Sequence, residues 1–212
     1  SCLFESIYFL SKGSMFANKN VEDIRYQYGI ELGKKESPIL SKEECIVIGA
    51  PSTGIPIGRG FADYLGIKYE QILVKNKNAG RSFILKNTEE RLGECRRKFI
   101  IDRGELMRDK IVYFVDDSLV RGNTLKVIIE ILKEYSPQEI HLRISSPKVL
   151  NICNYGIDIP SREELIMNYN TEEQYIKKIG ADSLVFLELG KLFNVLGDKS
   201  YCVDCFNSTL EW

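Results

Sequence analysis

The sequence predicts an α/β fold in which a mainly parallel, twisted sheet carries helices on both faces. Short apolar runs rich in branched residues alternate with segments of helical spacing, and no repeat, low-complexity tract or Pro/Gly/Ser-rich linker interrupts them. Such alternation implies right-handed crossovers and a sheet covered on both faces. At 212 residues the chain can bury a real core. We therefore expect a single domain over residues 1–212.

Five apolar runs are expected to form the strands. In chain order they are CIVIGA (45–50), YEQILV (69–74), IVYFV (111–115), EIHLRIS (139–145) and SLVFLEL (183–189). Helical spacing covers roughly 20–33, 55–65, 88–98, 123–135 and 171–179. The first of these helices precedes the first strand, and the other four lie between strands that would then run parallel.

The composition is that of an ordinary globular protein, with 44% apolar and 28% charged residues. A formal net charge of -1 gives no electrostatic reason to expect nucleic acid or an anionic membrane as the partner. No apolar stretch reaches transmembrane length, and the N-terminus lacks the pattern of a signal peptide. We expect a cytoplasmic protein with neither kind of partner.

Three loops directly follow predicted strands, and all three are rich in small, polar or cationic residues. They are PSTG (51–54), KNKNAGRSF (75–83) and DDSLVRGNT (116–124). In open parallel sheets, ligands bind beyond the carboxyl ends of the strands, where the connections diverge. The three loops are therefore candidates for one ligand site.

The loop DDSLVRGNT combines a glycine turn with the start of a helix. Gly122 permits a tight backbone path, and Asn123 and Thr124 lead into the helix. Free amide groups at a helix start favour an anion such as phosphate. Ser118 and Thr124 can add hydroxyl donors, and Arg121 a cationic fork. The pattern therefore indicates a phosphate site.

Asp116 and Asp117 carry the opposite charge and are not aimed at the phosphate. Sugar hydroxyls or a hard cation such as Mg²⁺ are the partners that suit adjacent carboxylates. The competing interpretation is an acidic N-cap followed by a glycine turn. It explains one acid and one hydroxyl, but not two adjacent acids followed by small residues and an arginine.

VDDSLVRGNT resembles the phosphoribosyl-pyrophosphate signature of type I phosphoribosyltransferases, and its DDS and VRG resemble the amidophosphoribosyltransferase family. Similarity to that family extends to YFL near the start, KNKNAGRSFI, ISSP, CNYGIDIPSREELI and IGADSLVFLELGKL. The resemblance implies a type I phosphoribosyltransferase-like fold. It also implies an enzyme that transfers the phosphoribosyl group of phosphoribosyl pyrophosphate to ammonia. The products would be phosphoribosylamine and pyrophosphate, in the first step of de novo purine synthesis.

The resemblance also implies which residues bind substrate. Lys75 and Arg81 would be catalytic, and Thr53, Asp116 and Asp117 would hold Mg²⁺. The full set expected around ribose 5-phosphate and pyrophosphate is Ser52, Thr53, Gly54, Lys75, Asn76, Arg81, Asp116, Asp117, Ser118, Val120, Arg121, Gly122, Asn123 and Thr124.

Two positions depart from the family pattern. Ser52 stands where the pyrophosphate loop of the family has an acid, and Asn78 stands where the family usually has an aromatic residue that lines the route for ammonia. Both departures favour a second hypothesis, a catalytically weak sensor of the same fold that binds phosphoribosyl pyrophosphate or purine nucleotides. A nucleobase-dependent type I transferase is a third, which the YGIDIPSREELI and IGADSL segments disfavour through resemblance.

Six cysteines occur in a chain without export signals, so burial, reactivity or metal binding is expected rather than disulfides. Cys45 and Cys95 read as small buried residues. Cys202 and Cys205 form a C-x2-C pair, whose spacing suits a shared metal. The residues that match a subset of the family with a four-iron, four-sulfur cluster are Cys2, Cys153, Cys202 and Cys205. The resemblance implies a structural [4Fe-4S] cluster that ties a C-terminal tail to the body, with zinc as the alternative.

The complete enzymes of the family begin with a glutaminase domain, and nothing in these 212 residues is long enough to be one. Ammonia would then come from free solution or from a separate glutaminase domain or subunit. The resemblance further implies a homo-oligomer and inhibition by purine nucleotides. The single histidine, His141, lies in an apolar strand pattern and is expected to be packed rather than catalytic.

Overall fold

The computed structural model describes residues 1–39, 41–77, 93, 96–157 and 161–206. Its main sheet has five strands in the order β4-β3-β7-β8-β9, and every neighbouring pair is parallel. The bounds, in sheet order, are β4 (Lys68–Tyr69), β3 (Cys45–Gly49), β7 (Ile111–Asp116), β8 (Glu139–Ile144) and β9 (Ser183–Phe186). The parallel sheet predicted from the alternation is confirmed.

The connections diverge between the two central strands β3 and β7. From β3 the chain passes through α2 (Gly54–Leu65) to the edge strand β4. From β7 it passes through α4 (Asn123–Lys133) to β8, on the other side, and then through α5 (Glu172–Ile179) to β9. Gly49 is paired with Val115 near the carboxyl ends of these strands. A ligand crevice is expected where the connections part in this way.

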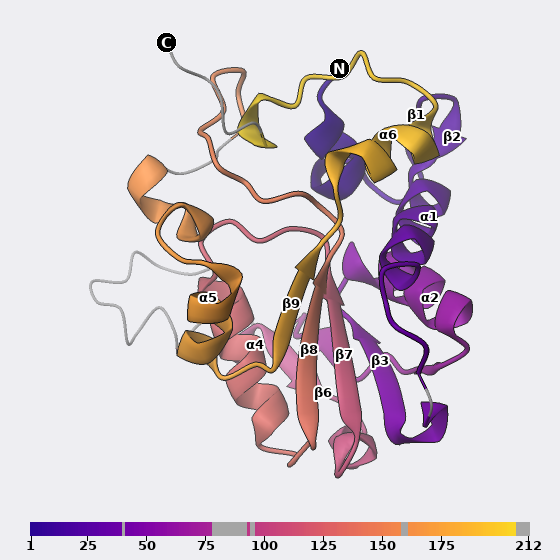
Figure 1. Ribbon diagram of the computed structural model, residues 1–212, viewed down its shortest axis with the longest axis vertical. Coiled ribbons are helices and arrows are strands. Elements are labelled where there is room, and N and C mark those ends of the chain that lie inside the picture. Colours follow the sequence, from indigo (N-terminus) through magenta and orange to yellow (C-terminus); the bar gives the residue numbers. More distant parts are fainter. Residues whose placement is uncertain (40, 78–92, 94–95, 158–160, 207–212) are drawn as a thin grey trace.

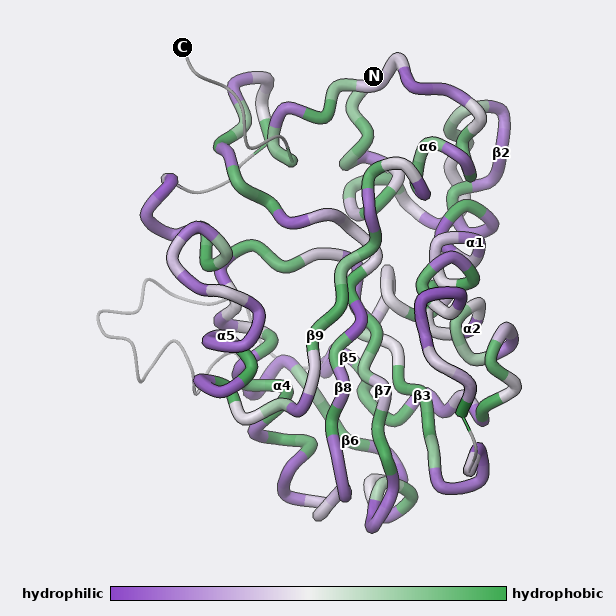
Figure 2. The backbone as a smooth tube through the Cα atoms, in the orientation of Figure 1, coloured by the Kyte–Doolittle hydropathy of each residue, from purple (hydrophilic) through white to green (hydrophobic). Residues whose placement is uncertain are grey.

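Helices cover both faces of the sheet, as predicted. α1 (Val21–Gly33), α2 and α6 (Leu189–Leu196) lie on one face, and α4 and α5 lie on the other (Figure 1). Successive residues of a strand point to opposite faces, so Val47 joins the core under α1 and α2, and Ile46 and Ile48 join the core under α4. The central strands are correspondingly hydrophobic along most of their length (Figure 2).

The first two helices pack unusually closely because both carry glycine at their contact. A Cβ on Gly29 would lie 1.9 Å from the carbonyl oxygen of Ile57, and one on Gly60 would lie 2.0 Å from that of Tyr26. Any side chain at either position would force the helices apart. This contact holds α2, and the loop that precedes it, against the N-terminal part of the chain.

The run YEQILV was predicted to be one strand, and this is wrong. Its start belongs to β4, while its end belongs to β5 (Leu73–Lys75), which pairs antiparallel with β6 (Phe99–Ile101) outside the main sheet. Between them the side-chain amide of Gln71 donates to the carbonyl oxygen of Gly49 at 3.2 Å. This side chain takes the place of a backbone ladder bond, so the chain can leave the sheet.

Other elements were absent from the sequence-based prediction. SLVFLEL forms a strand only to Phe186, and Leu189 already begins α6. A small hairpin joins β1 (Met15–Phe16) to β2 (Lys19–Asn20). Short helical turns cover Glu5–Phe9, Lys42–Glu44, Gly104–Met107, Arg162–Glu164, Ile166–Asn168 and Asp204–Phe206. The helix expected at 88–98 falls mostly outside the described residues.

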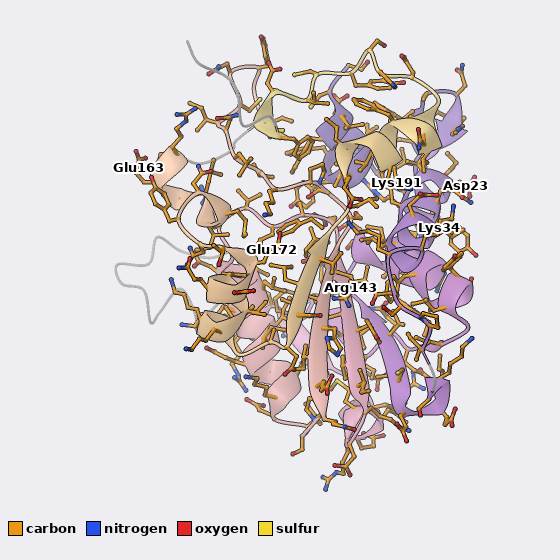
Figure 3. All side chains as sticks on the ribbon, viewed as in Figure 1. Asp23, Lys34, Arg143, Glu163, Glu172 and Lys191 are labelled. Atoms are coloured by element: carbon orange, nitrogen blue, oxygen red, sulfur yellow. The ribbon has the colours of Figure 1, made fainter. Side chains whose placement is uncertain are left out.

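His141 is packed in a polar network, in line with the prediction. Its Nδ1 lies 2.7 Å from Ser183 Oγ, and its Nε2 lies 2.8 Å from a Glu139 carboxylate oxygen. Arg143, also on β8 and labelled in Figure 3, is buried against Glu36. Within the part of the chain that the structure describes, none of the helices has the length and apolar character needed to span a bilayer.

Candidate active site

A cavity of about 560 Å³ opens at the carboxyl ends of β3 and β7. Its volume falls in the range usual for sites that bind small molecules. The predicted site residues that line it are Ser52, Thr53, Lys75, Asp116, Asp117, Ser118, Val120, Arg121, Gly122, Asn123 and Thr124. The three loops singled out in the sequence thus contribute to one cavity, as expected.

Asp117 joins the loops that follow the two central strands. One of its carboxylate oxygens accepts a hydrogen bond from the Thr53 hydroxyl, and the other accepts one from Ser118 Oγ at 2.5 Å. Asp117 is only 5% exposed. The carboxylate is therefore fixed in position by donors from both sides of the point where the chain diverges.

Asp116 lies beside it, and its Oδ1 accepts the backbone N–H of Asp117 at 2.8 Å. Burial raises the pKa of both carboxyl groups, and the charge of Asp117 raises the pKa of Asp116 further. Lys75 acts in the opposite direction on the pKa of each. Two carboxylates confined together in a poorly solvated site favour the binding of a cation or of hydroxyl donors.

Arg25 supplies a buried positive charge behind Asp117. Its Nε donates to the carbonyl oxygens of Ser6 and Ile7 at 3.0 Å each, and a terminal nitrogen donates to that of Leu10 at 2.9 Å. The guanidinium also acts to lower the pKa of the Asp117 carboxyl. Nothing local in the sequence links residue 25 to the loop, so sequence reasoning did not place Arg25 in the site.

The expected phosphate loop ends at the start of α4. Gly122 precedes this helix with a φ of +77°, a conformation that favours glycine. No side chain of the cap position bonds to the amide groups of the first turn. The amide groups at a helix start and the helix dipole favour an anion, and Asn123 and Thr124 line the cavity.

Arg121 does not follow the simple expectation of a phosphate ligand. Its Nε donates to a carboxylate oxygen of Glu164 at 2.6 Å. The guanidinium is thereby paired with an acid of a later segment. In this arrangement the arginine fastens the loop, although the residue still lines the cavity.

Two further predicted residues stand apart from the cavity. Gly54 begins α2, and a Cβ there would lie 2.7 Å from the carbonyl oxygen of Val115, so its role is close packing. The side-chain amide of Asn76 donates to the carbonyl oxygen of Arg97 at 3.0 Å, and Asn76 is not among the lining residues. Arg81, like Asn78, lies outside the described residues.

Sequence reasoning missed an aromatic wall of the cavity, formed by Phe4, Tyr8 and Phe9. The ring centroids of Phe4 and Phe9 lie 5.7 Å apart, and those of Tyr8 and Phe9 lie 5.0 Å apart. Tyr8 and Phe9 are each 49% exposed. The available signal was the YFL stretch, which was read only as part of a resemblance.

The N-terminal and C-terminal segments lie side by side (Figure 1). Cys2 and Cys202 form an isolated parallel bridge, and the N–H of Leu3 donates to the carbonyl oxygen of Cys202 at 3.1 Å. The carbonyl oxygen of Cys205 accepts the N–H of Leu150 at 2.8 Å. Backbone contacts thus bring the predicted cysteine positions to one region.

The thiols of this region interact. The pKa of the Cys205 thiol is raised to about 12, mainly by burial and further by Cys2, Cys153 and Cys202. Cys45 lies elsewhere, with its thiol 3.5 Å from the carbonyl oxygen of Ser41. Among the described residues, no three or more His, Cys, Asp or Glu side chains are placed to hold one metal ion together.

Comparison with known proteins adds to this geometry. The sequence model of the phosphoribosyl transferase domain matches residues 20–146. The chloroplastic amidophosphoribosyltransferase of Vigna aconitifolia is 38% identical over 209 residues, which are 97% of this chain and 42% of that protein. The amidophosphoribosyltransferase of Methanocaldococcus jannaschii is 36% identical over 205 residues, again 97% of this chain and 42% of that protein.

Two solved structures are also similar. The glutamine phosphoribosylpyrophosphate amidotransferase of B. subtilis, complexed with ADP and GMP, has a TM-score of 0.84 and 34% identity. The match covers 98% of this chain and 46% of that chain. A structure described as the allosteric regulatory enzyme of purine biosynthesis has a TM-score of 0.85 and 34% identity, over 98% of this chain and 45% of that chain.

The chain thus spans less than half the length of each of these relatives. The domain match extends over more than half of the 212 residues, and its range contains β3, β7 and the three loops that were singled out in the sequence. The chain therefore belongs to the phosphoribosyl transferase domain family, and these amidophosphoribosyltransferases are among its relatives.

Proposed function

We propose that this chain transfers the phosphoribosyl group of phosphoribosyl pyrophosphate to ammonia, giving phosphoribosylamine and pyrophosphate. This reaction is the first step of de novo purine synthesis. The observation that carries the proposal is one cavity lined by Asp116 and Asp117, by the first residues of α4, and by Thr53 and Lys75. Phosphoribosyl pyrophosphate needs three kinds of group at once: carboxylates for its hydroxyls, amide groups of a helix start for its 5-phosphate, and a basic side chain for its pyrophosphate.

The substrate would lie with its 5-phosphate at the start of α4 and its pyrophosphate at the loop after β3. Its 5-phosphate would accept hydrogen bonds from the amide groups at the start of α4, after Gly122. Its ribose hydroxyls would donate to Asp116 and Asp117. Its pyrophosphate would lie toward Thr53 and Lys75, where the basic side chain can stabilise the charge that develops on the leaving group.

The bond changes are simple. The bond between the anomeric carbon and the pyrophosphate oxygen breaks, and its electron pair leaves with pyrophosphate. The lone pair of ammonia forms the new carbon–nitrogen bond, and the nitrogen then loses one proton to solvent. Because ammonia supplies the nucleophile, the protein needs to position the reactants and stabilise charge rather than provide a strong base.

Mg²⁺ fits the residues present. Thr53, Asp116 and Asp117 offer the oxygen ligands that Mg²⁺ prefers. Burial raises the pKa of both carboxyl groups, so a divalent cation would stabilise carboxylates that water solvates poorly. When bound, the ion would neutralise charge on the pyrophosphate. The protein groups would hold the sugar and keep the two carboxylates in position.

The test is an assay of pyrophosphate release from phosphoribosyl pyrophosphate with ammonia and Mg²⁺. The proposal expects release well above the uncatalysed rate, and its loss in the double variant Asp116→Asn with Asp117→Asn. Circular dichroism would check that the variant is folded. Release no faster than the uncatalysed rate in the wild-type protein, although substrate binds, would refute the enzymatic proposal.

A second candidate function is a catalytically weak module that binds phosphoribosyl pyrophosphate or purine nucleotides. Ser52 favours it, because a hydroxyl stands where the family has an acid and the residue has a φ of +78° at the cavity. The B. subtilis relative is described as complexed with ADP and GMP, which supports nucleotides as inhibitors. Binding of these ligands without pyrophosphate release would select this function.

We also propose that Cys2, Cys153, Cys202 and Cys205 hold a structural [4Fe-4S] cluster. The mutual influence of the four thiols supports a shared site. The backbone bridge between Cys2 and Cys202 brings two of these cysteines together from opposite ends of the described chain. A zinc ion bound by the same four thiolates is the alternative.

Metal analysis after anaerobic purification tests the cluster. The expected result is four iron atoms per chain and broad visible absorbance, both lost in Cys205→Ser. Cys45→Ser is the matched control, since Cys45 is buried but outside the set, and it should keep the iron. Equimolar zinc without iron would contradict the proposal.

The remaining partners follow from the same proposal. A glutaminase domain or subunit would supply ammonia where free ammonia is scarce. A homo-oligomer and a cytoplasmic location remain predictions from the sequence.

A further inference from the structure

Three consecutive residues of the phosphate loop are held by one later segment, Glu164–Tyr175. The backbone N–H of Ile166 donates to the carbonyl oxygen of Val120 at 3.0 Å. Glu164 pairs with Arg121 at 2.6 Å. The hydroxyl of Tyr175 donates to the carbonyl oxygen of Gly122 at 3.2 Å. The loop is therefore fastened from outside the cavity at every residue from 120 to 122.

These contacts fix the direction of the loop amide groups. In a planar trans peptide the C=O and the following N–H point in opposite directions. With the carbonyl of Gly122 held by Tyr175 and by the N–H of Lys126 at 3.0 Å, the N–H of Asn123 is directed the other way. It therefore points away from the body of α4 at the N-terminal end of this helix, where Asn123 lines the cavity.

Tyr175 acts on the loop without reaching the cavity. Its side chain is 2% exposed, and it is absent from the cavity lining. Its ring also fills the space beside Gly122, where an added Cβ would lie 2.6 Å from the hydroxyl oxygen. Tyr175 thus contacts the loop through both the hydroxyl and the ring.

The helix that carries Tyr175 is itself well anchored. Thr171 and Gln174 form a reciprocal capping box at the start of α5. Glu172, the first residue of α5, is labelled in Figure 3, and α5 packs beside α4. A residue near the start of this helix therefore has a fixed position relative to the start of α4.

We propose that Tyr175 is a positioning residue that sets the Val120–Asn123 loop to receive the 5-phosphate of the substrate. The inference rests on the proposed function in one respect, which is that the anion at α4 belongs to a ribose phosphate. The Tyr175 hydroxyl orients the peptide plane between Gly122 and Asn123, and the Tyr175 ring sets the distance between α5 and the loop.

The test compares two ligands with the full chain by calorimetry. Ribose 5-phosphate would use the α4 start, whereas magnesium pyrophosphate would use Thr53 and Lys75. Tyr175→Phe should weaken ribose 5-phosphate binding by roughly three- to tenfold, the effect of one lost hydrogen bond. Tyr175→Leu should weaken it more, because the ring contact is lost as well. Pyrophosphate affinity should stay within about twofold of wild type in Tyr175→Phe.

Tyr169→Phe is the matched control, since Tyr169 lies in the same region but is 63% exposed. It should leave both affinities unchanged. Unaltered ribose 5-phosphate affinity in Tyr175→Phe, or an equal loss for both ligands, would overturn the inference. Failure of the wild-type chain to bind ribose 5-phosphate would overturn the proposed function and this inference together. Absence of pyrophosphate release while ribose 5-phosphate still binds would overturn the proposed reaction alone.

Discussion

The hydroxyl of Thr53 donates a hydrogen bond to the carboxylate of Asp117. This contact links the loop after β3 to the loop after β7, at the place where the connections part toward opposite sides of the sheet. Thr53 also lines the cavity, so the same hydroxyl serves the protein framework and the expected metal and pyrophosphate region.

Replacing Thr53 with valine keeps the shape but removes this hydroxyl. Because Asp117 then loses a donor in a buried site, we expect the KM for phosphoribosyl pyrophosphate to rise by roughly tenfold or more. Thr53→Ser retains the hydroxyl and should stay close to wild type. Steady-state kinetics over a range of Mg²⁺ concentrations would measure both, and equal KM values for wild type and Thr53→Val would contradict the role given to this bond.

Lys75 and Lys77 offer a matched pair of nearby basic residues. Lys75 lines the cavity, while the exposed Lys77 is not among the lining residues. We expect Lys75→Gln to lower kcat by roughly a hundredfold, since it removes positive charge near the departing pyrophosphate. Lys77→Gln should change kcat by less than about threefold. A similar loss in both variants would mean that only the general charge of the segment matters.

Ser52 is held in the left-handed region, with a φ of +78°. Ser52→Gly should relieve this strain and raise the free energy of unfolding by about 0.5–1 kcal/mol, while lowering the affinity for phosphoribosyl pyrophosphate because the loop becomes less ordered. Ser136 also has a positive φ, of +53°, but is not among the residues that line the cavity. Urea unfolding should show a similar gain for Ser136→Gly, without any change in affinity. An equal effect of the two variants on affinity would contradict this account.

Tyr69 gives a prediction about alkaline stability. Burial raises the pKa of its phenol from 10.0 to about 12. The folded state therefore keeps the proton more tightly than the unfolded state, and this contribution to stability is present below pH 10 and lost as the pH rises toward 12. Urea unfolding at pH 9 to 11.5 should show a smaller decline in Tyr69→Phe than in wild type. Identical slopes would contradict a buried phenol at this position.

The strands of the core were predictable because they are buried on both faces and read as unbroken apolar runs, as in β3 and β7. The division of YEQILV was not, because it depends on a tertiary bond from Gln71 to the carbonyl oxygen of Gly49. Local propensity carries no information about such a contact.

The residues of the candidate site were likewise predictable only in part. Asp117 and Gly122 were found because a strand, two acids and a glycine turn stand together in the sequence. Arg25 behind Asp117, and Tyr175 behind Gly122, were not found, because each comes from a distant helix. Arg121 was expected to face phosphate and is paired with Glu164, a tertiary contact that overrides the local pattern.

We propose that Asp116 and Asp117, at the carboxyl end of β7, bind the sugar of phosphoribosyl pyrophosphate. Titration calorimetry with this ligand and Mg²⁺ tests this binding most directly in wild type, Asp117→Asn and the control Asp23→Asn. Asp23 lies on α1 (Figure 3) and is not among the residues that line the cavity. We predict binding by wild type and Asp23→Asn, and affinity at least about tenfold weaker in Asp117→Asn. Equal affinity in all three proteins would contradict the account.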